Sequence, residues 1–233
     1  MCGGSLINTR YVLTAAHCIK TKSSVKLVAV RLGEHDKNTA NDCIDFIDGT
    51  KHCAPEAYDV DIEEIIIYDQ YNRPNRFQND IALIRMAQKI KYSESVRPIC
   101  LPVDERVRHQ QLFKYVITGW GKTEKQTVSS VLLKATVDHV SIPECQQEMY
   151  DNFLAVTLVD PWQMCARGAN LTDACKGDSG GPLGTSVAVD GIPKFVQFGI
   201  VSAGIRSCGK KGVSGIYTSV PAYMNWIVAN MRP

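Results

Sequence analysis

The most informative stretch of the chain is Asp173-Ala174-Cys175-Lys176-Gly177-Asp178-Ser179-Gly180-Gly181-Pro182. Glycines on both sides leave little bulk around the Ser179 hydroxyl, so a substrate backbone can approach it closely. A glycine at 177 allows a turn in which the N–H groups of Gly177 and Ser179 point to one side. Such a pair binds the oxygen that becomes negative during acyl transfer. The alternative is a glycine-rich surface turn with an incidental serine, unless a base and an orienting acid occur elsewhere.

Length and charge exclude several classes of protein. With 233 residues the chain can bury a sizeable core, as one large domain or two small ones. A net charge of +2 gives no electrostatic reason to expect nucleic acid or an anionic membrane as a partner. No apolar run approaches the length of a membrane span.

The cysteines indicate an oxidising compartment. There are nine, and no two of them form the C-x-x-C pair typical of a metal site, so disulfides are favoured. Because nine is odd, one sulfur is either free or bonded outside this chain. No secretory signal opens the sequence, and Met1-Cys2-Gly3-Gly4 is typical of the interior of a protein, so we expect a fragment.

Short apolar runs separated by glycine-rich turns predict an all-β barrel or sandwich. A short helix is expected from Pro143 and a closing helix over 221–231, where Tyr223, Ile227 and Met231 recur at helical spacing. The expected strands are 2–7, 11–14, 25–32, 60–68, 115–121, 131–140, 195–201 and 215–220.

Two residues outside the serine segment are candidates for the base and the acid. His17 stands next to Cys18, and a bridge between Cys2 and Cys18 would fix it at the edge of a small loop. Asp80 stands at the start of an apolar run, where a partly buried carboxylate needs hydrogen-bond partners. The alternatives are a structural histidine and a turn aspartate that caps a loop.

Residues 36–56 are polar and are expected to form a long loop. A disulfide between Cys43 and Cys53 would cross-link this loop and restrict its freedom in the unfolded chain.

Taken in order, these motifs resemble the chymotrypsin/trypsin-like serine protease family. They are Thr14-Ala15-Ala16-His17-Cys18, Asn79-Asp80-Ile81-Ala82-Leu83, Thr118-Gly119-Trp120-Gly121 and Gly177-Asp178-Ser179-Gly180-Gly181-Pro182, with Cys175 and Cys208 in matching places. The resemblance covers nearly the whole chain. It implies two antiparallel β-barrels packed face to face, a C-terminal α-helix, and a site in the cleft between the barrels. The N-terminal barrel would be 1–104, incomplete at its start and carrying His17 and Asp80. The C-terminal barrel would be 105–233, carrying Ser179, and both would form one peptidase domain.

The resemblance implies a mechanism that needs no cofactor. His17 takes the proton of the Ser179 hydroxyl as it attacks a peptide carbonyl, and Asp80 orients the imidazole and stabilises the imidazolium. The N–H groups of Gly177 and Ser179 form the oxyanion hole. Since His17 must start neutral, activity is expected to rise with pH through about 6.5, the ordinary pKa of histidine.

The resemblance also assigns substrate-binding residues. Asp173 stands at the base of the primary pocket, as in relatives that cleave after Arg or Lys, and Gly204 and Gly215 line its walls. Ala174 replaces a serine that could bind a lysine ammonium, which favours arginine. Lys176 and Ser202 complete the predicted substrate contacts. Ala203, where the family usually has an aromatic residue, predicts weaker selection of neighbouring substrate residues.

The resemblance pairs the cysteines as Cys2–Cys18, Cys43–Cys53, Cys145–Cys165 and Cys175–Cys208. The Cys43–Cys53 loop, followed by Ala54-Pro55, is similar to the arthropod clip-domain proteases of immune and developmental cascades. Cys100 is then left over, and its counterparts tether an N-terminal clip domain or light chain. Glu34 matches a position where relatives bind calcium in a loop, the alternative being a solvated loop without an ion.

The family is made as zymogens, and cleavage creates an N-terminal amine that pairs with the aspartate before the serine, here Asp178. We therefore expect a secreted, extracellular endopeptidase (in haemolymph if the source is an arthropod) that activates a zymogen or pro-cytokine. Serpin-type inhibitors are expected partners, and nucleic acid and membranes are not. The alternatives are a catalytically inactive homologue that serves as a cofactor or scaffold, an inactive truncated product, or a disulfide-rich adhesion domain.

Overall fold

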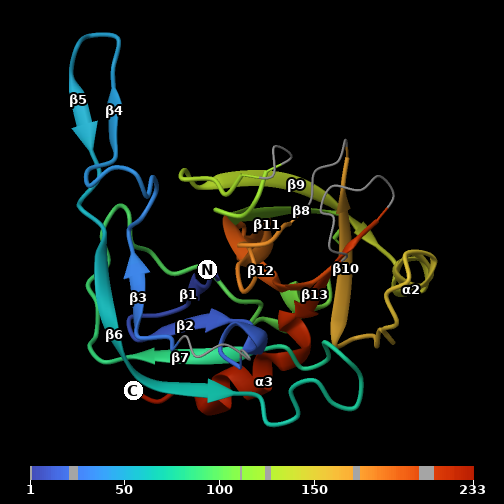
Figure 1. Ribbon diagram of the computed structural model, residues 1–233. Helices are drawn as coiled ribbons and strands as arrows, with labels where there is room; N and C mark the ends of the chain where they lie inside the picture. Colours follow the sequence, from blue (N-terminus) through green and yellow to red (C-terminus); the bar gives the residue numbers. More distant parts are fainter. Residues whose placement is uncertain (1, 21–25, 111, 124–126, 170–173, 205–212) are drawn as a thin grey trace.

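The computed structural model describes all residues except 1, 21–25, 111, 124–126, 170–173 and 205–212. The expectation of an all-β fold with a C-terminal helix is confirmed (Figure 1). One antiparallel sheet lies in the N-terminal half of the chain, and a closed barrel lies in the C-terminal half.

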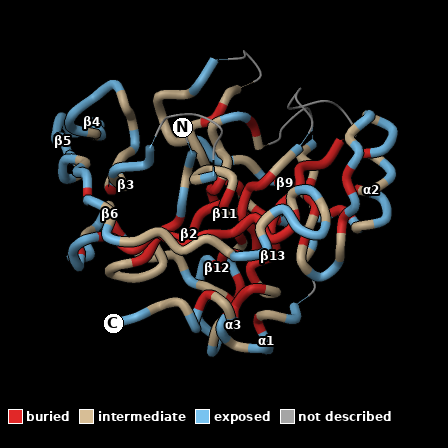
Figure 2. Tube along the Cα trace, turned by 60° about the horizontal axis from the view of Figure 1, so that its bottom comes forward, coloured by how far each residue is buried: buried red, intermediate tan, exposed pale blue. Residues whose placement is uncertain are grey.

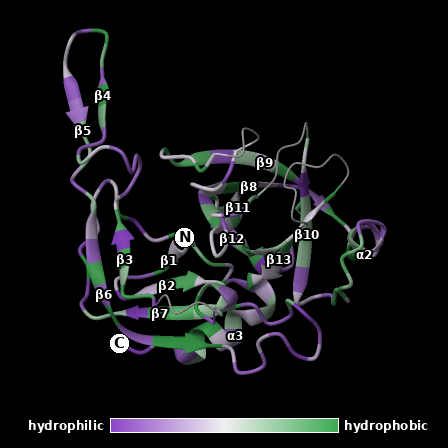
Figure 3. Ribbon diagram, viewed as in Figure 1, coloured by the Kyte–Doolittle hydropathy of each residue, from purple (hydrophilic) through white to green (hydrophobic). Residues whose placement is uncertain are grey.

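The N-terminal sheet has five strands in the order β1-β2-β7-β6-β3. Between the described residues of its outer strands β1 and β3 there is no pairing, so this half is a half-barrel. Strand β6 begins hydrophilic and ends hydrophobic (Figure 3), since Ile65, Ile66 and Ile67 close it. The strands are β1 (Ser5–Leu6), β2 (Tyr11–Thr14), β3 (Ala29–Leu32), β6 (Tyr58–Ile67) and β7 (Ala82–Met86).

The C-terminal half closes into a six-stranded barrel in the order β10-β13-β12-β11-β8-β9. Its strands are β8 (Lys114–Gly119), β9 (Leu133–Val140), β10 (Gln163–Gly168), β11 (Pro182–Val189), β12 (Ile192–Ala203) and β13 (Gly215–Ser219). The barrel encloses a cluster that includes Tyr115, Leu183, Phe198 and Tyr217. Within the barrel, buried residues are most continuous along β13 and the second half of β12, and red segments mark buried residues in Figure 2. Burying such side chains stabilises a fold by about 1.5–3 kcal/mol each.

The predicted helices are present. α2 (Ile142–Asp151) begins after Ser141, whose side chain accepts a hydrogen bond from the Glu144 N–H. α3 (Val220–Asn230) buries Tyr223, Met224 and Ile227 against β2 and β7. Two short elements, η1 (Ala16–Cys18) and α1 (Glu105–Arg108), had no sequence signal. Within the described residues, no helix combines the length and hydropathy required to cross a membrane.

The long polar loop is more ordered than expected. The predicted Cys43–Cys53 disulfide is present, and it joins two strands, β4 (Cys43–Asp45) and β5 (Lys51–Cys53), into a hairpin. This hairpin projects from the rest of the molecule (Figure 1). Its tip exposes the large apolar side chains of Phe46 and Ile47.

Two further predicted disulfides, Cys2–Cys18 and Cys145–Cys165, are present. Cys175 is also disulfide-bonded, while its predicted partner Cys208 lies outside the described residues. Cys100 is unpaired and exposed, as the odd cysteine count requires.

Candidate active site

His17 and Asp80 lie in hydrogen-bond contact, although 63 residues separate them. His17 lies in the single turn of η1, directly after the buried pair Ala15-Ala16. The Asp80 carboxylate is fully buried and lies 2.7 Å from the His17 Nδ1 through Oδ2. Its Oδ1 accepts a hydrogen bond of 2.8 Å from the His17 backbone N–H. One carboxylate therefore fixes both the backbone and the ring of the histidine.

The C-terminal barrel supplies two more contacts to Asp80. The Ser202 hydroxyl donates to Oδ2 at 2.5 Å, and the Thr218 hydroxyl donates to the Asp80 carbonyl oxygen at 2.8 Å. With three donors the buried carboxylate is well satisfied, which its burial requires. The sequence predicts a substrate contact for Ser202 and no bond to Asp80, because no local signal connects residues 122 positions apart.

Ser179 lies beside His17. Its carbonyl oxygen accepts a hydrogen bond of 2.7 Å from the Gly3 N–H. The Cys18 sulfur lies 3.5 Å from that same oxygen and 3.8 Å from the His17 Nε2. In the described part of the chain, no hydrogen bond joins the Ser179 hydroxyl to His17. Thus the fold brings the predicted nucleophile, base and acid to one place.

The atoms of Cys2, His17 and Cys18 also lie within 4.8 Å of one another. Both sulfurs belong to the Cys2–Cys18 disulfide and offer no thiolate, the form in which cysteine binds metals. This cluster is therefore a disulfide packed against the histidine and not a metal centre.

The predicted oxyanion turn has an unusual backbone. Gly177 has φ +116°, and a Cβ there would lie 2.8 Å from the Gly121 Cα. Only glycine fits such a position without displacing the neighbouring chain. The Asp178 N–H donates to the Cys175 carbonyl oxygen. Over the described residues, the N–H groups of Gly177 and Ser179 donate to no protein acceptor.

The Asp178 carboxylate lies against Gly119, which ends strand β8, and Gly121, which follows that strand. It accepts hydrogen bonds from the Gly121 N–H at 2.7 Å and the Cys175 N–H at 2.9 Å. Burial raises the pKa of Asp178, and the two hydrogen bonds offset only part of that effect. A cavity of about 230 Å³ opens next to this carboxylate, with Gly3, Gly119 and Gly181 in its wall.

The predicted specificity residues are only partly described. Asp173 lies outside the described residues, while Ala174 packs against the barrel core. Gly204 and Gly215 face each other, since a Cβ on Gly204 would lie 4.0 Å from the Gly215 Cα. The Lys176 carbonyl oxygen accepts from the Lys122 N–H at 3.0 Å, and the residue is exposed.

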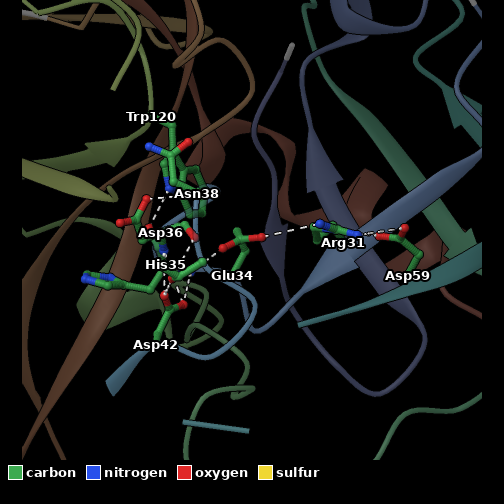
Figure 4. Close-up of polar contacts among 9 residues, drawn as sticks. Arg31, Glu34, His35, Asp36, Asn38, Asp42, Asp59 and Trp120 are labelled. Carbon is green, nitrogen blue, oxygen red and sulfur yellow. Dashed lines mark hydrogen bonds and ion pairs between the residues drawn. The ribbon is translucent and has the colours of Figure 1, made fainter. Parts of the chain in front are cut away.

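Glu34 belongs to a hydrogen-bonded turn at the base of the hairpin (Figure 4). Its carboxylate accepts from the His35 N–H and forms an ion pair with Arg31 at 3.5 Å. Asp42 accepts from the N–H groups of His35 and Asp36. Calcium needs six to eight oxygen ligands, whereas these oxygens are engaged by N–H groups and a guanidinium. In this arrangement they form no calcium cage, and calcium binding stays a prediction from resemblance.

Comparison with known proteins agrees with this geometry. The sequence model of the Trypsin family matches residues 1–227. The chain belongs to the trypsin family. The triad chemistry of that family needs no cofactor.

Several similar proteins come from insects. Melanization protease 1 of Drosophila melanogaster is 44% identical over 236 residues, which cover 99% of this chain and 58% of that protein. The Spaetzle-processing enzyme of the same species is 41% identical, covering 100% of this chain and 59% of that protein. The crystal structure of the Drosophila Grass clip serine protease of the Toll pathway superposes with a TM-score of 0.84 at 39% identity, covering 97% of this chain and 62% of that one. The predicted similarity to clip-domain proteases is confirmed, and the chain spans about three fifths of these relatives.

Proposed function

We propose that this chain is the catalytic part of a serine endopeptidase that cleaves after arginine, and after lysine more slowly. The substrate would be a zymogen or a pro-cytokine in an extracellular immune or developmental cascade. The observation that carries the proposal is the buried Asp80 carboxylate, bonded to both the backbone and the ring of His17, with Ser179 alongside.

The reaction follows from the positions of these groups. The Ser179 hydroxyl attacks the peptide carbonyl while His17 Nε2 accepts its proton, and the carbonyl oxygen becomes negative beside the N–H groups of Gly177 and Ser179. The tetrahedral intermediate collapses as the imidazolium donates its proton to the leaving amine. Water then repeats the sequence on the acyl-enzyme and releases the acid. Asp80 keeps its negative charge throughout and stabilises the imidazolium.

Regulation by an amine is the second part of the proposal. Asp178 is a partly buried carboxylate with a raised pKa and an adjacent cavity, and an ammonium group placed there would neutralise it. In the trypsin family such an amine arises by cleavage of the precursor. We propose that Asp178 pairs with it, and that the exposed Cys100 tethers a clip domain or light chain.

The boundary between the N-terminal half-barrel and the C-terminal barrel would lie near residue 104. Asp104 caps α1, and Val107 of that helix already belongs to the barrel core. Secretion into haemolymph and control by serpin-type inhibitors complete the proposed setting. The names of two relatives, a melanization protease and a Spaetzle-processing enzyme, support the cascade role in this proposal.

A serine-directed phosphonate tests the proposal directly. The full-length protein, processed at its activation site, is treated with the phosphonate and digested for mass spectrometry. Labelling at Ser179, lost in Ser179→Ala, is expected. An unlabelled but folded protein would favour the catalytically inactive homologue instead.

Primary specificity is tested with matched arginine and lysine peptides. Because Ala174 offers no hydroxyl to a lysine ammonium, the arginine peptide should have the higher kcat/KM. Ala174→Ser should narrow the ratio by about 5-fold, the worth of one hydrogen bond. Ser186→Ala, an exposed change on β11, is the control and should leave the ratio unchanged. Equal turnover of both peptides by the unaltered enzyme would contradict the arginine preference.

A further inference from the structure

The residue before the catalytic acid has an unusual conformation. Asn79 adopts the left-handed region with φ 59°, and it is buried. Its carbonyl oxygen accepts a hydrogen bond of 2.9 Å from the Ile81 N–H, which encloses Asp80 in a three-residue turn. The direction in which the Asp80 side chain leaves the backbone is therefore set by the conformation of Asn79.

The side chain of Asn79 makes three hydrogen bonds that hold this conformation. Its NH₂ group donates to the carbonyl oxygens of Gln70, at 2.9 Å, and Arg73, at 2.7 Å. Its amide oxygen accepts from the Tyr223 hydroxyl at 2.6 Å. The amide thus connects the loop before β7 to α3, and asparagine is one of few residues that tolerate the left-handed region.

Tyr223 is a rigid anchor for this contact. It is buried in α3, and its ring lies 5.3 Å from that of Tyr68 and 5.2 Å from that of Trp162, measured between centroids. Burial raises the pKa of Tyr223, so the hydroxyl stays protonated and remains a donor. Burial, with a smaller contribution from Asp80, also raises the pKa of Tyr71 to about 12. Neither phenol carries a charge near Asp80 at neutral pH.

We infer that Asn79 is a positioning residue for the catalytic acid: locked by Tyr223 and two loop carbonyls, it sets the depth and direction of the Asp80 carboxylate against His17. The bonds from Ser202 and Thr218 fix Asp80 from the barrel side, whereas Asn79 fixes it from its own chain. This inference rests on the proposed protease function. It adds that full activity requires Asn79 as well as the three residues of the triad.

The test compares three variants of the processed full-length enzyme, with kcat counted per phosphonate-titrated site. Asn79→Gly keeps the positive φ but removes all three side-chain bonds. It should lower kcat about 100-fold with KM unchanged, as a displacement of about 1 Å in a catalytic group does. The acid limb of its pH–rate profile should move to lower pH, because a displaced carboxylate stabilises the imidazolium less. Tyr223→Phe removes one hydroxyl and should lower kcat about 5-fold.

Tyr68→Phe removes a hydroxyl from the same aromatic cluster and should leave kcat unchanged. The double variant Asn79→Gly/Tyr223→Phe should be no slower than Asn79→Gly, since Asn79→Gly already breaks the hydrogen bond that Tyr223→Phe removes. If Asn79→Gly lowers only the melting temperature and keeps the kcat and pH profile of the unaltered enzyme, the inference is wrong. A folded, unaltered enzyme that the phosphonate does not label would overturn the proposed function, and this inference with it.

Discussion

The acid–base half of the site and the nucleophile half are built differently. Asp80 and His17 lie where the half-barrel meets the barrel, and every oxygen of the Asp80 carboxylate has donors. The serine turn is rich in glycine, and the carboxylate of Asp178 beside Ser179 in the sequence is partly buried, with a raised pKa and, among the described residues, two backbone donors. The first half is complete within this chain. In the second half, two backbone N–H groups offset only part of the burial of the Asp178 carboxylate, and it is there that we propose activity is controlled.

The largest loss of activity should come from a change in the acid–base half, at Asp80. Asp80→Asn keeps the shape of the side chain but reverses which histidine tautomer it favours, so kcat/KM should fall about 10⁴-fold. That magnitude is taken from the trypsin family, the standard case for this change. The measurement is hydrolysis of an arginine ester by the processed enzyme. Circular dichroism and disulfide mapping should match the unaltered protein, and near-normal turnover would refute the assignment of Asp80.

A smaller effect should come from the nucleophile half. Gly177→Ala places a methyl group 2.8 Å from the Gly121 Cα and disfavours the φ of +116°. The turn must shift, and kcat should fall about 100-fold through a misplaced oxyanion donor. The pH midpoint should be unchanged, because His17 and Asp80 are not touched.

Gly191→Ala is the matched control for that experiment. Gly191 also has a positive φ, of +78°, but a Cβ there would meet nothing within 4 Å. The control should therefore lose a little stability and no activity. If both variants lose activity equally, the effect of Gly177→Ala would be general backbone strain and not a specific role in the turn.

The smallest effect concerns stability against pH in the unprocessed protein. The pKa of Asp178 is raised above its ordinary 3.8 in the folded state, so the folded state holds the proton more tightly than the unfolded chain does. The contribution of this group to the free energy of unfolding is fully present below pH 3.8 and falls as the pH rises through the folded-state pKa. Urea titrations between pH 3 and about pH 7 measure this slope.

Asp178→Asn should remove that part of the pH dependence, whereas Asp151→Asn, an exposed change at the end of α2, should keep it. Processing that delivers an ammonium group to the cavity should abolish or reverse the slope. If the free energy of unfolding depends on pH equally in the unaltered protein and in Asp178→Asn, burial does not raise the pKa of this carboxyl group.

The sequence predicts the catalytic residues better than it predicts the hydrogen bonds that position them. His17, Asp80 and Ser179 were accessible because each has a short motif around it, and the half-cystines 2, 18, 43 and 53 because spacing and resemblance agree. The hydrogen bonds from Ser202 to Asp80 and from Tyr223 to Asn79 could not be predicted from the sequence. They join residues 122 and 144 positions apart and depend on how the barrel and α3 pack against the loop before β7.

Secondary structure shows the same limit. β6 was predicted from its run of β-branched residues, and α3 from its helical spacing. β11 was not expected, because small residues such as Gly184, Ser186 and Ala188 carry little strand preference. The backbone hydrogen bonds that pair this strand with β12 stabilise it in place of side-chain preference.

The stapled hairpin has a practical consequence for anyone who purifies this protein. Lys51 stands between Cys43 and Cys53 on an exposed strand, where a protease specific for basic residues can reach it. A cut after Lys51 opens the chain yet leaves both pieces covalently joined through the bridge. Such nicked material migrates as one band until a thiol reductant is added, so homogeneity has to be judged on reduced gels.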